Sequence, residues 1–139
     1  MARDGGLRTL FATRIKTAHW QSVETWSTGQ GVPDTNVCLD GIESWIEFKQ
    51  TETTKINFEP HQVSWIERRR RAKGRVFVAV RRRCSPGPRR AARDELHLFS
   101  GDEARSLLLN GLGETRSLGA WESGPSVWDW ERVETLLRS

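Results

Sequence analysis

The alternation of apolar and polar residues along the first half of the chain predicts a short helix followed by three strands. Residues 7–16 have the weak period of a helix, and residues 19–26 alternate in part as a strand does. Two runs rich in β-forming residues follow, over 35–39 and 42–50. Asp40-Gly41 separates these two runs and favours a two-residue type I′ turn, so the pattern predicts a β-hairpin.

The second half begins with a polar loop over residues 51–58. Pro60 then suits the first turn of a helix, and Gly74 suits its end. The remaining expected elements are a buried strand over 75–80 with three arginines at its exit, a loop over 85–90, a strand over 95–99, a helix over 102–109 capped by Gly101 or Asp102, and a helix over 127–137 with Ser126 as N-cap. This order predicts a mixed α/β fold, and 139 residues fit one domain over 1–139.

The net charge of +4 conceals a strong asymmetry along the chain. Residues 66–93 contain twelve Lys or Arg and a single acid, Glu67, whereas the rest of the chain has ten basic and seventeen acidic residues. A basic block of this kind is typical of a protein that binds a polyanion. The acids elsewhere are left free to form a metal site.

The distribution of cysteine, histidine and apolar residues argues against a zinc protein, a disulfide-rich protein and a membrane protein. Cys38 and Cys84 do not form a CxxC pair, and the three histidines are scattered, which argues against a zinc site and a disulfide framework. The first residues lack the apolar stretch of a secretory signal, and no run approaches the ~20 apolar residues of a membrane span. We therefore expect a cytoplasmic protein.

The predicted hairpin brings two carboxylates together. With a turn at Asp40-Gly41, paired residues have numbers that sum to 81, so Asp34 lies opposite Glu47, and Lys49 shares the face of Glu47. Carboxylates ~5 Å apart repel unless a hard cation lies between them. The alternative is an exposed hairpin with ordinary surface charges, but the apolar residues around Glu47 leave little of this strand as a solvated face.

The same residues match a family pattern. Val32-Pro33-Asp34, twelve residues and then Glu47-Phe48-Lys49 resemble the motif of the PD-(D/E)xK nuclease superfamily. The pattern continues through Pro60-His61-Gln62, Ala72-Lys73-Gly74 and the strand over 75–80, and so resembles VRR-NUC-type nucleases and small phage and archaeal Holliday-junction resolvases over roughly residues 19–83. The resemblance implies a restriction-endonuclease-like core, a mixed central β-sheet flanked by helices.

The resemblance also implies roles for single residues. Asp34 and Glu47 would bind a divalent metal, Mg²⁺ or else Mn²⁺, and the carbonyl oxygen of Phe48 would be a further ligand. Lys49 would position the attacking water and stabilise developing charge. Gln62 would be an accessory catalytic residue, or else a surface glutamine of its helix. Glu24 would be an upstream acid that shares in metal binding and catalysis, or else a surface carboxylate.

The basic block is expected to contact the DNA backbone, since phosphate contacts supply affinity with little sequence preference. Its alternative is a solvated helix face. The residues assigned to DNA binding are Arg68, Arg69, Arg70, Arg71, Lys73, Arg81, Arg82, Arg83, Arg89 and Arg90. Three tryptophans near the end of the chain, Trp121, Trp128 and Trp130, are expected in the core, with a dimer surface or base stacking as the alternatives.

Together these features predict a Mg²⁺-dependent DNA endonuclease without an organic cofactor. By the resemblance it would be selective for branched DNA, in the manner of a Holliday-junction resolvase, would act as a homodimer and would be encoded by a phage, working in the host cell cytoplasm. Two alternatives stay open. One is a sequence-specific restriction- or homing-type endonuclease on the same fold. The other is a DNA-binding module without catalytic activity.

Overall fold

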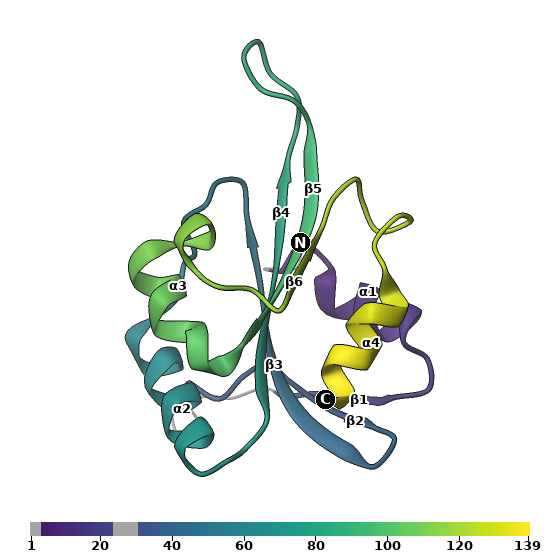
Figure 1. Ribbon diagram of the computed structural model, residues 1–139, viewed down its shortest axis with the longest axis vertical. Coiled ribbons are helices and arrows are strands. Elements are labelled where there is room, and N and C mark those ends of the chain that lie inside the picture. The colour runs from purple at the N-terminus through teal and green to yellow at the C-terminus, as the bar shows by residue number, and fades with distance from the viewer. Residues whose placement is uncertain (1–3, 24–30) are drawn as a thin grey trace.

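The computed structural model describes residues 4–23 and 31–139. Over these residues the chain forms a six-stranded mixed sheet whose strands neighbour one another in chain order, β1 to β6. The strands are β1 (His19–Ser22), β2 (Thr35–Leu39), β3 (Ile42–Thr51), β4 (Val76–Cys84), β5 (Arg93–Ser100) and β6 (Gly119–Trp121). Helices α1 (Leu7–Arg14) and α4 (Trp130–Arg138) cover one face, and α2 (Pro60–Arg71) and α3 (Ala104–Asn110) cover the other (Figure 1). The predicted fold class, a mixed sheet flanked by helices, is confirmed.

The β2–β3 hairpin has the predicted turn and register. Asp40 and Gly41 have φ angles of 52° and 79°, as a type I′ turn requires. Leu39 pairs with Ile42 and Thr35 with Ile46, so the paired numbers sum to 81. On its other edge β3 pairs with β4 in parallel, with Lys49 beside Val80, while the remaining strand pairs of the described sheet are antiparallel.

Each face of the sheet has its own hydrophobic core. Successive residues of β4 divide between them, because side chains alternate along a strand: Phe77 and Ala79 belong to the α1/α4 core, and Val78 and Val80 to the α2/α3 core. Trp128 is buried in the α1/α4 core, and Trp121 and Trp130 pack against it. The expectation that these tryptophans lie in the core is confirmed for Trp128, whereas Trp121 and Trp130 are half-buried at its edge.

The strands β4 and β5 are longer than the sequence predicts. β4 continues to Cys84 and takes in the three arginines that we placed at its exit, and β5 begins at Arg93. The extension pairs residues of opposite charge, Arg82 with Glu95 and Arg83 with Asp94. Of these two, Arg83 and Asp94 approach to 3.9 Å, and a cross-strand charge pair of this kind stabilises a sheet, so a charged run that looks like a loop can continue the strand.

Several helix ends also differ from their predictions. Lys73, with φ of 70°, takes the left-handed position after α2, while the Gly74 N–H donates to the carbonyl of Arg69 in a Schellman motif. The side chain of Asp129 caps α4 in place of Ser126, so this helix begins at Trp130. The Ser100 side chain accepts from Asp102 N–H and caps a 3-10 turn, η1 (Gly101–Glu103), before α3.

One short strand and one short 3-10 turn lie outside the predicted elements. The three-residue strand β6 was not predicted, because it is too short to show a period. A second 3-10 turn, η2 (Leu112–Glu114), follows α3. The end of the first predicted strand, residues 24–26, lies outside the described residues. Within the described part of the chain, the helices are too short and too polar to span a bilayer.

Candidate active site

Glu47 and Lys49 project from β3 toward α2, since alternate residues of a strand share a face. Asp34 lies just before β2, and its backbone N–H donates to Glu47 Oε1 at 3.3 Å. The Thr35 hydroxyl donates to Asp34 Oδ1 at 3.0 Å. Glu47 has only 5% of its surface exposed, so a carboxylate that ordinarily faces water is held inside the fold.

Gln62 connects the two charged residues of β3. Its Nε2 donates to Glu47 Oε2 at 3.1 Å, and its Oε1 accepts from Lys49 Nζ at 3.0 Å. The same Oε1 accepts from the backbone N–H of Glu59 at 3.0 Å, a contact that ties the amide to the first turn of α2. Lys49 Nζ also lies 3.5 Å from Glu47 Oε2 and donates to the carbonyl of Asn57 at 3.0 Å. The start of α2 thus fixes both side chains.

Burial sets the electrostatics of this cluster. It raises the pKa of Glu47 from 4.5 to about 7, with the neighbouring charge of Asp34 as the second cause and Lys49 opposing both. Burial likewise raises the pKa of Asp34, although its hydrogen bond with Thr35 acts in the other direction. Two close, buried carboxylates destabilise each other's charged form. A cation placed between them would remove that cost.

The oxygens available here suit a hard divalent cation. Asp34 and Glu47 supply carboxylates, and the carbonyl of Phe48 follows Glu47 in the chain, beyond the last β2–β3 pair. Among the described residues, no group of three or more His, Cys, Asp or Glu side chains could hold a metal. The site is therefore a pair of carboxylates with neighbouring backbone oxygens, and the fit to Mg²⁺ depends on waters or phosphate oxygens for the other positions.

The structure brings Asp34, Glu47, Lys49 and Gln62 together, while Glu24 lies outside the described residues. Sequence reasoning missed Asp4, whose carboxylate accepts from the backbone N–H groups of Gly6 at 2.9 Å and Arg8 at 3.2 Å. Its charge raises the pKa of Asp34, and that of Arg8 lowers it. An acid just before a helix is a recognisable cap signal, but its closeness to Asp34 depends on the tertiary fold.

Two of the residues assigned to DNA binding hold a carboxylate through two hydrogen bonds each. Arg81, 7% exposed, holds Asp94 through two hydrogen bonds of 2.8 Å and lies over the ring of Trp128. Arg70 holds Asp102 in the same two-bond manner. The enclosed guanidinium of Arg81 argues against its assignment to DNA binding, and the assignment of the half-buried Arg70 stays a prediction.

The other basic residues remain on the surface. Arg69 stacks on Trp65 with its guanidinium carbon 4.6 Å from the ring centroid. Arg82 is half-buried, and its Nε has no hydrogen-bond partner among the described residues. The exposed residues among those assigned to DNA binding are Arg68, Arg69, Arg71, Lys73, Arg83, Arg89 and Arg90.

Comparisons with known proteins add little to this geometry. No family model matches the chain, and no curated protein matches it. Among solved structures, the chain is similar to that of Hjc from Archaeoglobus fulgidus, described as a Holliday junction resolvase from an archaeal hyperthermophile. The match has a TM-score of 0.44 and 14% identity, and it covers 91% of this chain and 88% of the other. That protein is of the kind that the motif resembles, but a likeness this distant decides nothing about activity.

Proposed function

We propose that this protein is a Mg²⁺-dependent DNA endonuclease that hydrolyses phosphodiester bonds. The observation that carries the proposal is the contact of the buried Glu47 with the half-buried Lys49 and Gln62, directly beside Asp34. Burying two carboxylates and an ammonium together is costly unless they bind a metal or a charged substrate. Polar clusters with perturbed pKa values of this kind are typical of catalytic sites.

Each residue of the cluster has a role in this proposal. Asp34, Glu47 and the Phe48 carbonyl would hold the metal ion, which when bound supplies a more acidic water and positive charge for the phosphate. Mn²⁺ has similar ligand preferences and could replace Mg²⁺. Lys49 supplies a second positive charge, which would orient the attacking water and stabilise charge on the phosphate. Gln62 holds Lys49 and Glu47 in place, as a positioning residue.

The proposed substrate is branched DNA. Exposed arginines and a lysine lie at the end of α2 and on the strands that follow it in the chain, and such residues bind phosphates without reading sequence, so selectivity would come from the shape of the DNA. Resolving a four-way junction needs two cuts, and a twofold homodimer would supply two sites. Together with the motif, this supports an enzyme of the Holliday-junction-resolvase type, in a setting of phage replication or recombination. A sequence-specific endonuclease would instead need side chains that read base edges.

Cleavage of four labelled substrates tests the proposal. Linear duplex, single strand, flap and four-way junction would be incubated with wild type, Lys49→Ala and the control Lys16→Ala, with Mg²⁺ or with EDTA. Lys16 is exposed and lies just beyond α1 on the other face of the sheet. We expect metal-dependent cutting of the junction, reduced about 10³-fold by Lys49→Ala and unchanged by Lys16→Ala. Cutting of particular duplex sequences would favour the restriction-type alternative, and binding without cutting would leave a DNA-binding module.

Removing the carboxylate of Asp34 or Glu47 tests whether these residues serve cleavage rather than DNA binding. Asp34→Ala or Glu47→Ala should abolish cleavage while DNA binding stays the same or tightens, because a negative charge close to the phosphate is lost. Binding would be measured in EDTA by fluorescence anisotropy, and cleavage in single-turnover assays with Mg²⁺. Equal loss of binding and cleavage would contradict the assignment of these residues to a metal site.

A further inference from the structure

The ends of β4 and β5 form a two-stranded ribbon that projects beyond both helical layers (Figure 1). Cys84 is its last buried residue, and every residue from 85 to 92 is exposed or half-buried. The tip is nonetheless ordered by pairing: the Gly87 N–H donates to Arg90 O at 3.0 Å, and the Arg90 N–H donates to Gly87 O at 3.3 Å. Pro88-Arg89 turns the chain between them. Residues 85–92 add no buried side chain to either core, so packing of the core does not explain why the ribbon extends this far.

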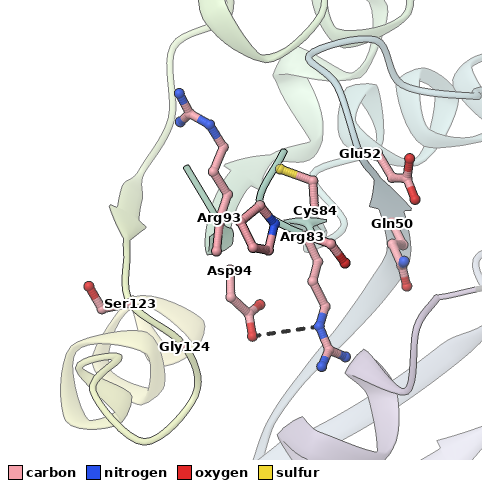
Figure 2. Close-up of a pocket in the computed structure, with 11 residues that line it drawn as sticks. Gln50, Glu52, Arg83, Cys84, Arg93, Asp94, Ser123 and Gly124 are labelled. Atoms are coloured by element: carbon pink, nitrogen blue, oxygen red, sulfur yellow. Dashed lines mark ion pairs between the residues drawn. The ribbon is translucent and has the colours of Figure 1, made fainter. Parts of the chain in front are cut away.

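Charge distinguishes the tip of the ribbon from its base. At the base, Arg83 lies 3.9 Å from Asp94, and Arg93 pairs with Glu95 at 2.8 Å. Figure 2 shows the pair of Arg83 and Asp94, both of which line a surface pocket at the base of the ribbon. At the tip Arg89 and Arg90 are exposed and have no ion-pair partner in the described part of the chain. Residues 85–92 contain no acid. The base therefore holds two acids, Asp94 and Glu95, among its four arginines, whereas the tip carries a charge of +2 without an acid or an ion-pair partner in the described part of the chain.

The prolines of the ribbon argue against pairing of its edge with a strand of another molecule. An exposed ribbon is a template for pairing with another strand, but Pro86 and Pro88 have no N–H to donate. A partner that binds charge rather than the strand edge suits the ribbon better. A two-stranded ribbon is also narrow enough to enter the ~12 Å major groove of DNA.

The position of the tip relative to the site suggests how DNA would lie. Lys49 is level with Val80 in the sheet, and Arg89 is nine residues further along, at most ~30 Å away at ~3.3 Å per residue. In the opposite direction, α2 runs from Gln62 at the site to Arg71, ~14 Å at 1.5 Å per residue. The exposed basic residues at the end of α2 and the ribbon tip therefore lie on opposite sides of the site along the strand direction.

We infer that the ribbon is a duplex-binding arm. Arg89 and Arg90 contact DNA up to about nine base pairs from the cut, and the end of α2 contacts it about four base pairs away on the other side, at ~3.4 Å per base pair. The inference rests on the proposed function, because it takes Glu47 and Lys49 as the position of the cut. To the proposed function it adds that the protein covers a longer stretch of DNA on the ribbon side of the cut than on the α2 side.

Junctions with shortened arms test this inference. Binding would be measured in EDTA, for arms of 4 to 14 base pairs, with wild type, Arg89→Ala plus Arg90→Ala, and the matched control Lys16→Ala plus Arg132→Ala. The control removes the same charge from exposed positions on the α1/α4 side. Wild type and control should lose affinity stepwise when an arm falls below about nine base pairs. The ribbon variant should bind long arms about tenfold more weakly, show no such step, and have a salt slope smaller by about 2.

The outcomes separate this inference from the proposed function. A ribbon variant that binds every arm length as the control does would overturn the ribbon inference, even if Mg²⁺-dependent cleavage stands. The wild type could instead show the stepwise loss of affinity, which the ribbon variant lacks, and yet cut no substrate. That result would support the duplex-binding arm and overturn the proposed nuclease activity. Equal thermal melting of the three proteins checks that the fold is intact, and charge reversal, Arg89→Glu plus Arg90→Glu, should weaken binding further.

Discussion

The two faces of β3 differ although both are buried. On the α1/α4 side Ile46 and Phe48 are 0% and 3% exposed and pack only against the apolar core. On the α2/α3 side Glu47 is 5% exposed but contacts Lys49 and Gln62. Neighbouring residues of one strand thus serve opposite purposes. Burial stabilises the fold on one face, and on the other it maintains a cluster that opposes folding and is suited to chemistry.

The largest effect should come from the apolar face. Phe48→Ala removes a buried ring that meets Phe11 edge-on, with ring centroids 5.0 Å apart, and leaves a cavity. We expect the free energy of unfolding to fall by about 3–5 kcal/mol, measured by urea denaturation. The backbone carbonyl is kept, so cleavage per folded molecule should change much less than stability. A loss under about 1 kcal/mol would show that this face is not tightly packed.

Glu47→Gln should act in the opposite direction on stability. The pKa of Glu47 is raised from 4.5 to about 7, so the folded state binds a proton more tightly than the unfolded state, and wild type loses stability as pH rises from about 4.5 to about 7. Glutamine has no charge to bury. Without metal, the variant should therefore be more stable than wild type by about 3 kcal/mol at pH 8, and no more stable at pH 4.

Thermal melting at the two pH values, with and without Mg²⁺, measures this difference. Metal should raise the melting temperature of wild type at pH 8, because it binds the folded state, and should have little effect on the glutamine variant. The variant should also lose cleavage. If the variant were less stable than wild type at pH 8, the buried carboxylate would be a favourable part of the fold, and the contrast between the two faces would fail.

Gln62→Ala tests the link between α2 and the cluster on β3. Lys49 and Glu47 would lose a shared partner but keep their own 3.5 Å contact. We expect cleavage to slow 10- to 100-fold and to need more Mg²⁺, while binding in EDTA is unchanged. Gln50→Ala is the control, since Gln50 is exposed on the same β3 strand but on its other face. An equal effect of both changes would mean that Gln62 has no positioning role.

Lys73→Gly should have the smallest effect on the α2/α3 side. Lys73 has φ of 70°, a left-handed conformation that costs a residue with a side chain about 1 kcal/mol. Glycine should stabilise the protein by that amount in urea denaturation. If Lys73 also contacts a phosphate, the salt slope of DNA binding should decrease by about 0.9. A stability gain with an unchanged salt slope would remove Lys73 from the DNA surface.

The sequence predicts the hairpin well because its information is local. Asp40-Gly41 fixes the turn, and the turn fixes the register that sets Asp34 opposite Glu47. The start of α2 follows from Pro60 in the same way. The family resemblance added Gln62, whose contacts with both charged residues no local pattern could show.

What the sequence did not predict depends on contacts between distant segments. Arg81 looks like part of a free basic run, but its side chain reaches diagonally across to Asp94 on β5. The extension of both strands into a ribbon follows from the same cross-strand charges. The effect of Asp4 on Asp34 requires the N-terminal turn to reach the mouth of the hairpin. Each of these depends on a tertiary partner that a local pattern does not reveal.

The parallel pairing of β3 with β4 has a consequence for the order of folding. The β2–β3 and β4–β5 hairpins can close over short connections, whereas β3 and β4 can pair only after residues 52–75 have formed the crossover through α2. Gln62 belongs to that crossover, so the cluster that it joins should be among the last parts to assemble. Pulse-labelled hydrogen exchange during refolding should protect the hairpin amides first, and simultaneous protection would show that hairpins and crossover form together.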